Sequence, residues 1–189
     1  SGGEKQALKD FTVMARFIPS KARIEIARAN AVIGDAVLDA KGALVRGAAG
    51  KSPAIDLAGR LQGSVPTATL MALWPDRLSV EARAWVAEHI RGGRVGEVGY
   101  EVRLPVGAIA PNKPLANEAI TVGFAVSDGE VLIRNDMPHL LATNGRALLR
   151  GDEFHMSIDR AQLNGVALSA GAIDMPRLAG DGRRYTARF

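Results

Sequence analysis

The stretch HMSIDRAQLNGVALSAGAID (His155–Asp174) decides the fold class, because apolar and polar residues alternate through most of it. A period of two residues is typical of a β-strand with one buried face, whereas a helix has a period of 3.6 residues. The pair Asn164-Gly165 inside the stretch marks a turn. We therefore expect this ribbon to form one wall of a long sheet.

Similar runs fill most of the chain, separated by turn residues at intervals of about 10–20 residues. They predict an antiparallel meander of long strands over about 11–63 and again over about 93–189. Asp128-Gly129 is the strongest hairpin signal, and Gly151-Asp152 marks a further turn. Asn144-Gly145 fits either a turn or a bulge within one long strand. The segment RRYTARF (Arg183–Phe189) is expected to add a terminal strand.

Residues of about 66–91 are the helical exception. Pro66 suits a first helical turn, Ser79 suits the N-cap of a second helix, and Gly92-Gly93 is expected to close it. An apolar stripe at helical spacing predicts that the second helix packs on the sheet through Leu78, Ala82, Trp85, Val86, His89 and Ile90. The predicted fold class is therefore mainly β with a small helical insert (α+β), as a long, curved, trough-like antiparallel sheet.

Length and composition predict one β-rich segment over 10–189, which we interpret as part of a larger repetitive protein. Residues 1–9 are expected to be an expression scar and a disordered start, because SGG is typical of such a scar. The chain has 189 residues, no cysteine and a net charge of +4. Its basic residues are scattered singly along the chain, which argues against nucleic-acid binding.

The motifs that suggest chemistry are incomplete. The loop GAAGKS (47–52) has Val45 where a phosphate-binding loop needs glycine, and Pro53 with a strand follows it. One strand face carries His155, Ser157 and Asp159, which could suggest a metal site. However, none of the three histidines of the chain has another histidine at the spacing that metal ligands need. Asp136 and His139 flank a turn at Pro138, and His89 belongs to the helix stripe. We therefore expect no enzyme activity, no cofactor and no metal site.

The order of these features resembles the AsmA-like envelope proteins of Gram-negative bacteria, and among them the YhdP-like group. The resemblance covers Asp56–Leu178. It is carried by DLAGRLQG, by LMALWP, by SVEARAWVAEHIRGGRVGEVGYEVRLP, and by the ribbon NGRALLRGDEFHMSIDRAQLNGVALSAG after the turn at Pro138. Relatives often carry an aromatic residue before that proline, where this chain has Met137.

The resemblance implies a parent protein anchored in the inner membrane, with a β-rich body in the periplasm that moves phospholipid between the inner and outer membranes. The implied partners are phospholipid acyl chains and neighbouring segments of the parent, which makes the membrane contact. The lipid-groove candidates on the inner face are Trp85, Val98, Tyr100, Val102, Ile120, Val122, Phe124, Val126, Phe154, Met156 and Ile158. The same residues fit a second interpretation, a closed core in a structural or docking module of the envelope.

Overall fold

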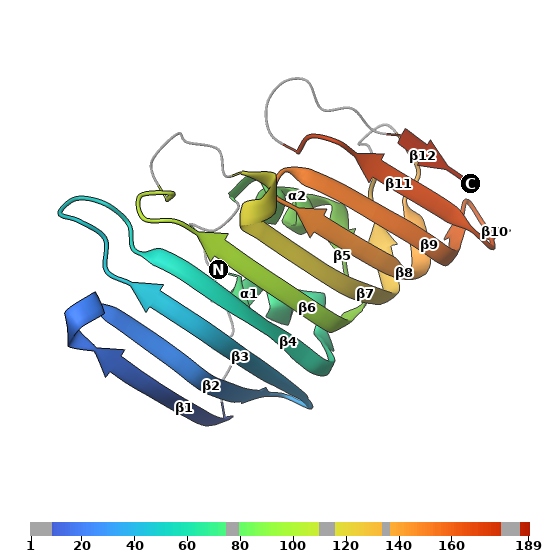
Figure 1. The fold of residues 1–189 in the computed structure, drawn as a ribbon. Coiled ribbons are helices and arrows are strands. Elements are labelled where there is room, and N and C mark those ends of the chain that lie inside the picture. Colours follow the sequence, from blue (N-terminus) through green and yellow to red (C-terminus); the bar gives the residue numbers. More distant parts are fainter. Residues whose placement is uncertain (1–8, 75–79, 110–115, 134–136, 179–185) are drawn as a thin grey trace, which may run out of the picture.

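The computed structural model describes residues 9–74, 80–109, 116–133, 137–178 and 186–189. They form one antiparallel sheet of 12 strands together with two short α-helices (Figure 1). The predicted fold class, mainly β with a helical insert and a long open sheet, is confirmed. Most of the start expected over 1–9 lies outside the described residues, as do Leu78, Ser79, Asp136 and residues 183–185.

The strands follow one another across the sheet in chain order. The N-terminal part contains β1 (Lys9–Ile18), β2 (Arg23–Ile33), β3 (Ala36–Val45) and β4 (Ala54–Pro66), with the 3-10 turn η1 (Pro19–Lys21) after β1. The C-terminal part contains β6 (Arg94–Leu104), η2 (Asn117–Ala119), β7 (Ile120–Val131), β8 (Leu140–Arg150), β9 (Glu153–Leu163), β11 (Gly171–Met175) and β12 (Thr186–Arg188). Two short strands, β5 (Ile90–Arg91) and β10 (Val166–Leu168), pair with β7 and β9.

Alternation of apolar and polar residues gives the sheet one buried and one exposed face. In β9, Phe154, Met156 and Ile158 are buried, while His155 and Asp159 are exposed. The ribbon His155–Asp174 lies in β9, β10 and β11, with a turn at Asn164-Gly165. The ribbon therefore contributes three strands, and both β10 and β11 pair with β9.

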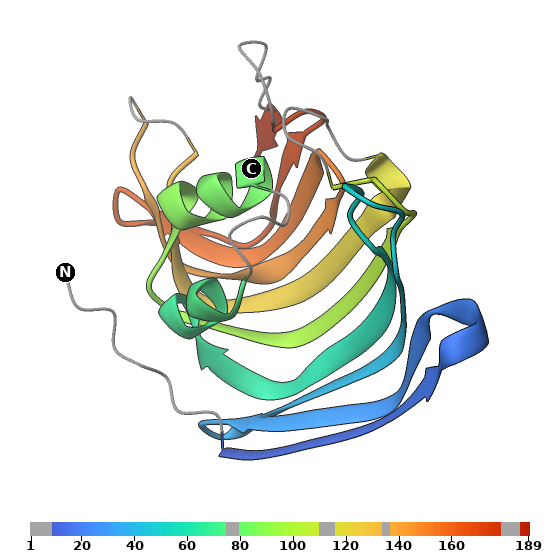
Figure 2. The same cartoon turned by 90° about the vertical axis from the view of Figure 1, so that its left-hand side faces the viewer.

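Both helices come from a single insert between the neighbouring strands β4 and β6. They are α1 (Thr67–Leu73) and α2 (Val80–His89), and they lie within the concave side of the curved sheet (Figure 2). The Thr67 hydroxyl donates a hydrogen bond of 2.6 Å to the carbonyl oxygen of Gly92, which ties the two ends of the insert together. The helix ends at His89 rather than at the glycines, because Ile90 leaves it to pair with Val131 of β7.

The concave face is closed where the helices cover it. Trp85 of α2 is 2% exposed, and its ring centroid lies 4.6 Å from that of His89 and 4.5 Å from that of Phe154. Trp85 and Val86 thereby join a continuous buried cluster with strands β2 to β11, which we call the main core. Trp74 is half-buried against the same cluster. The two tryptophans thus fasten the insert to the sheet.

The prediction of a hairpin at Asp128-Gly129 is wrong. Both residues lie inside β7, where Asp128 has a φ of 52° and the pairing with β8 shifts on either side of Gly129. An aspartate in the left-handed region followed by glycine suits a bulge as well as a turn, so the local signal does not separate the two. Asn144-Gly145 is likewise a bulge, inside β8.

Side-chain contacts on the convex face, which is the face opposite the helices, hold the C-terminal strand β12 against β11. His155 Nδ1 lies 2.5 Å from one carboxylate oxygen of Asp174, and Arg188 of β12 donates to the other at 2.9 Å. The His155 hydrogen bond, with the help of Arg188, lowers the pKa of Asp174 below its ordinary value of 3.8. A carboxyl group with a lowered pKa stabilises the fold above that ordinary pKa.

We expect Trp85→Ala to lower the free energy of unfolding by about 3–5 kcal/mol, because it opens a large cavity between α2 and the sheet. Urea titration followed by far-UV circular dichroism measures the change. Val80→Ala is the control in the same helix, since Val80 is 53% exposed, and it is expected to change stability by less than about 0.5 kcal/mol. Equal effects of the two variants would contradict the packing described.

Asp174→Asn is expected to flatten the acid limb of the stability curve. The contribution of Asp174 is complete above pH 3.8 and is lost as the pH falls through the lower pKa of the folded state. Solvent screening keeps the effect modest, because 35% of the side chain is exposed. Urea titrations at a series of acid pH values measure it. The exposed Asp159 provides the control Asp159→Asn, and the same flattening there would argue against the His155 contact as the cause.

Candidate functional site: an apolar strip on the concave face

Strand pairing shows which side chains share the concave face with the helices. Directly opposed residues of antiparallel strands lie on the same face of a sheet. Leu38 of β3 pairs with Leu61 of β4, which pairs with Val98 of β6. All three pack in or against the main core beneath the helices. Alternate residues of β3, β4 and β6 in phase with these three therefore also point to the concave side.

The apolar rows of this face continue beyond the main core to the N-terminal edge of the sheet. One row runs from Phe17 through Ile24, Leu44 and Ile55 to Leu104, over strands β1, β2, β3, β4 and β6. A parallel row includes Ile26 and Leu57, and Phe11 and Val13 alternate with Phe17 along β1. We call these residues, without the buried Leu104 and with two from the central strands, the open strip: Phe11, Val13, Phe17, Ile24, Ile26, Leu44, Ile55, Leu57, Tyr100 and Val122.

Exposure increases along the open strip toward β1. Phe17 is 63% exposed and Ile24 is 40% exposed, whereas Leu104 at the other end of the row is 2% exposed. Phe11 and Val13 are also exposed, at 65% and 44%. Leu44, Ile55, Leu57, Tyr100 and Val122 are half-buried. The helices lie away from β1, as Figure 2 shows, so this part of the concave face has apolar side chains without the cover that closes the main core.

The structure places the eleven groove candidates in three groups. Two residues are half-buried on the open strip, Tyr100 and Val122. Two belong to a small buried cluster at the end of β6, Val102 and Ile120. The rest are buried in the main core: Trp85, Val98, Phe124, Val126, Phe154, Met156 and Ile158. Lipid contact at the nine buried residues would require α2 or the segment before β7 to move, so their role in lipid binding stays a prediction.

Eight residues of the open strip are not among the groove candidates that the sequence predicts. Their alternation was visible in FTVMARF (11–17) and in the two runs that follow it. Periodicity alone could assign them to one face of a strand. It could not show that the insert after β4 covers the later strands and leaves β1 and the Ile24 end of β2 open. The missing information was the position of a distant element in space.

Tyr100 lies near the inner end of the open strip, next to Val122 of β7. Its hydroxyl donates a hydrogen bond of 3.2 Å to the backbone carbonyl of Asp39, and its ring lies over Gly59. A Cβ atom at Gly59 would lie 2.5 Å from the Tyr100 hydroxyl and 2.0 Å from the Asp39 carbonyl oxygen. Burial raises the pKa of Tyr100 above its ordinary value of 10.0. The hydroxyl is therefore neutral at physiological pH and suits an apolar surface.

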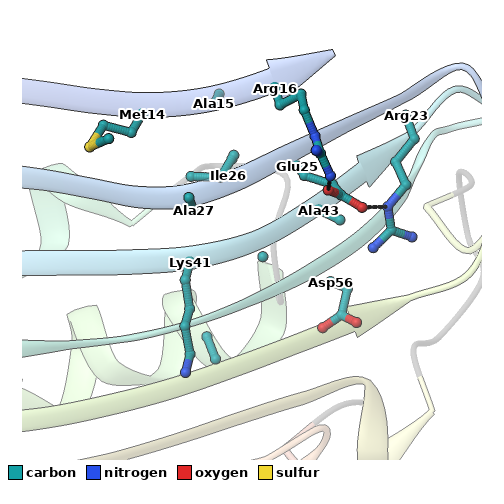
Figure 3. A pocket seen from close by; sticks show the side chains of 12 residues that line it. Met14, Ala15, Arg16, Arg23, Glu25, Ile26, Ala27, Lys41, Ala43 and Asp56 are labelled. Carbon is teal, nitrogen blue, oxygen red and sulfur yellow. Dashed lines mark hydrogen bonds and ion pairs between the residues drawn. The ribbon is translucent and has the colours of Figure 1, made fainter. Parts of the chain in front are cut away.

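The convex face carries a shallow hollow of about 700 Å³ over β1 to β4. Figure 3 shows that the Glu25 carboxylate at its rim pairs with two guanidinium groups, those of Arg16 and Arg23. Lys41 and Asp56 lie nearby. The Arg16–Glu25 and Arg23–Glu25 distances are 2.9 Å and 3.1 Å. The hydrogen bond from Arg16 is the main cause of the lowered pKa of Glu25. Two cations are thus already paired within the hollow, and solvent screens all of these charges.

All three histidines have protein partners. His139 pairs with Glu130, and His89 is buried against Trp85 with its Nδ1 atom 2.9 Å from the Trp85 carbonyl oxygen. His155 points outward from β9 to Asp174. The described part of the chain contains no group of three or more residues that could hold a metal ion. The loop 47–52 connects β3 to β4, so a strand follows it as expected.

Comparison with known proteins gives no relative, since no family model, no curated protein and no solved structure matches the chain. Among the described residues, no helix has the length and apolar character needed to cross a membrane. The resemblance to AsmA-like proteins therefore depends on the sequence motifs alone.

Gly59→Ala is expected to destabilise the protein by about 1–3 kcal/mol, because the added methyl group would overlap the Asp39 carbonyl oxygen and the Tyr100 hydroxyl. Gly99→Ala is the matched control in the neighbouring strand β6, where a Cβ atom would meet no atom within 4 Å. Thermal or urea unfolding compares the two. Tolerance of both substitutions would contradict the close packing of Tyr100 on Gly59.

Proposed function

We propose that this chain is a β-rich periplasmic segment of an AsmA-like envelope protein, and that its open strip contacts phospholipid acyl chains during their movement between the inner and outer membranes. The observation that carries the proposal is the row of apolar side chains that starts at the small buried cluster around Leu104 and reaches solvent at Phe17 and Ile24. Contiguous exposed apolar surface of this kind is typical of an interaction site. The proposal includes no catalytic residue and no cofactor.

The dimensions of the open strip suit an acyl chain. The row from Phe17 to Leu104 crosses five strands, which at a spacing of about 4.8 Å gives a width of roughly 20 Å. One leaflet of the hydrocarbon core of a bilayer is about 15 Å thick. An acyl chain that leaves water gains about 0.8 kcal/mol for each buried CH₂ group. Apolar contact alone can therefore supply the affinity.

A closed structural or docking module is the second candidate function. The burial of nine of the eleven groove candidates favours it, because those side chains are packed against protein in this structure. In this alternative, the exposed part of the strip contacts a neighbouring segment of the parent protein. The two functions differ in whether lipid binds to the isolated chain.

Native mass spectrometry with extraction of bound lipid tests the proposal. We expect the chain to take up phospholipid from liposomes, and we expect Ile24→Asp to abolish that uptake while the protein stays folded by circular dichroism. A carboxylate in the strip would have to lose its water when an acyl chain binds.

Leu148→Asp is the matched control for this substitution. Leu148 is 38% exposed, close to the 40% of Ile24, but it pairs with His155 on the convex face. Lipid uptake should survive in this variant. A chain that stays free of lipid after incubation with liposomes would contradict the lipid proposal and favour the closed module.

A further inference from the structure

Strand β1 is a long, open edge of the sheet. It has 10 residues, and among the described strands it pairs with β2 alone, on one side. Residues 10–17 are all exposed. The opposite edge, β12, has 3 residues. Sheet edges are usually kept short, charged or covered, because their free N–H and C=O groups can pair with a further strand. An edge like β1 is therefore suited to take one.

The side chains of β1 make it complementary to itself. If two copies of β1 pair antiparallel about Met14, Phe11 of each copy lies opposite Phe17 of the other, and Val13 lies opposite Ala15. Phe11 and Phe17 are the two most exposed aromatic side chains of the strand, at 65% and 63%. Aromatic residues directly opposed across two strands stabilise the pair.

This register also keeps the faces of the two sheets together. A two-fold axis that passes through a residue pairs odd positions with odd positions, so both concave faces lie on the same side. An axis between two residues would place the apolar side chains of one copy beside the polar side chains of the other. The charges also fit an axis at Met14. The residue of the second copy that lies opposite Asp10 is then two positions from Arg16 of that copy, so the opposite charges of Asp10 and Arg16 are diagonal neighbours across the two strands.

We propose that β1 pairs antiparallel with β1 of a second copy of this chain, about a two-fold axis at Met14, to form one continuous sheet. The open strips of the two copies then join across the axis. The proposal goes beyond the function proposed above and depends on the edge alone, so it can be tested without lipid.

A single cysteine tests the pairing directly, because the chain contains none. Met14→Cys would place two thiols opposite each other on the axis. We expect mild oxidation to give a covalent dimer on a non-reducing gel, much faster than for Val166→Cys. Val166 lies in β10 and is equally exposed, 63% against 62% for Met14. Equal rates for the two variants, together with a monomer in sedimentation of the unmodified chain, would overturn the proposal.

Two further variants define the axis and the strength of the pairing. Cross-linking of Val13→Cys but not of Met14→Cys would overturn the proposed axis. Met14→Lys should shift the sedimentation equilibrium toward monomer, because it places two ammonium groups together, and it leaves the concave open strip unchanged. A lipid-binding monomer in that variant would show that dimer formation and lipid binding are separate properties.

Discussion

The packing of Trp85 on Phe154 is the interaction on which the rest of the structure depends. An antiparallel sheet with one apolar face must bury that face against a second layer. Here the second layer consists of two helices from one insert, and Trp85 is the large side chain that joins α2 to the strands. Because the insert is short, it covers the central and C-terminal strands, and among the described residues it leaves residues 10–17 of β1 and Ile24 of β2 exposed.

This partial cover produces the two properties that suggest a function. The concave face near β1 keeps an apolar surface in contact with solvent, and among the described strands β1 pairs with β2 alone. Both features would be costly in a protein that acts as an isolated, closed domain. They are consistent with a segment that extends through contact with lipid, with further protein, or with both.

Local sequence signals predicted an element correctly where the pattern is compatible with only one structure. Alternation over ten or more residues in β8 and β9 is compatible with a half-buried strand and with little else. Asn164-Gly165 formed the expected turn, whereas Asp128-Gly129 formed a bulge. Both pairs place a residue at positive φ, and the difference between them comes from pairing with β8, which is a long-range interaction.

The sequence by itself determined the class of the fold, the position of the helical insert and the alternation that gives each strand an apolar side. Those are local properties, because they depend on backbone preference and on a period of two residues. The tertiary structure alone decided which apolar residues are core and which are surface. Phe124 and Phe17 both lie on the apolar side of an alternating strand, yet one is 4% exposed and the other 63%. The reason is that burial depends on where the insert folds back across the sheet.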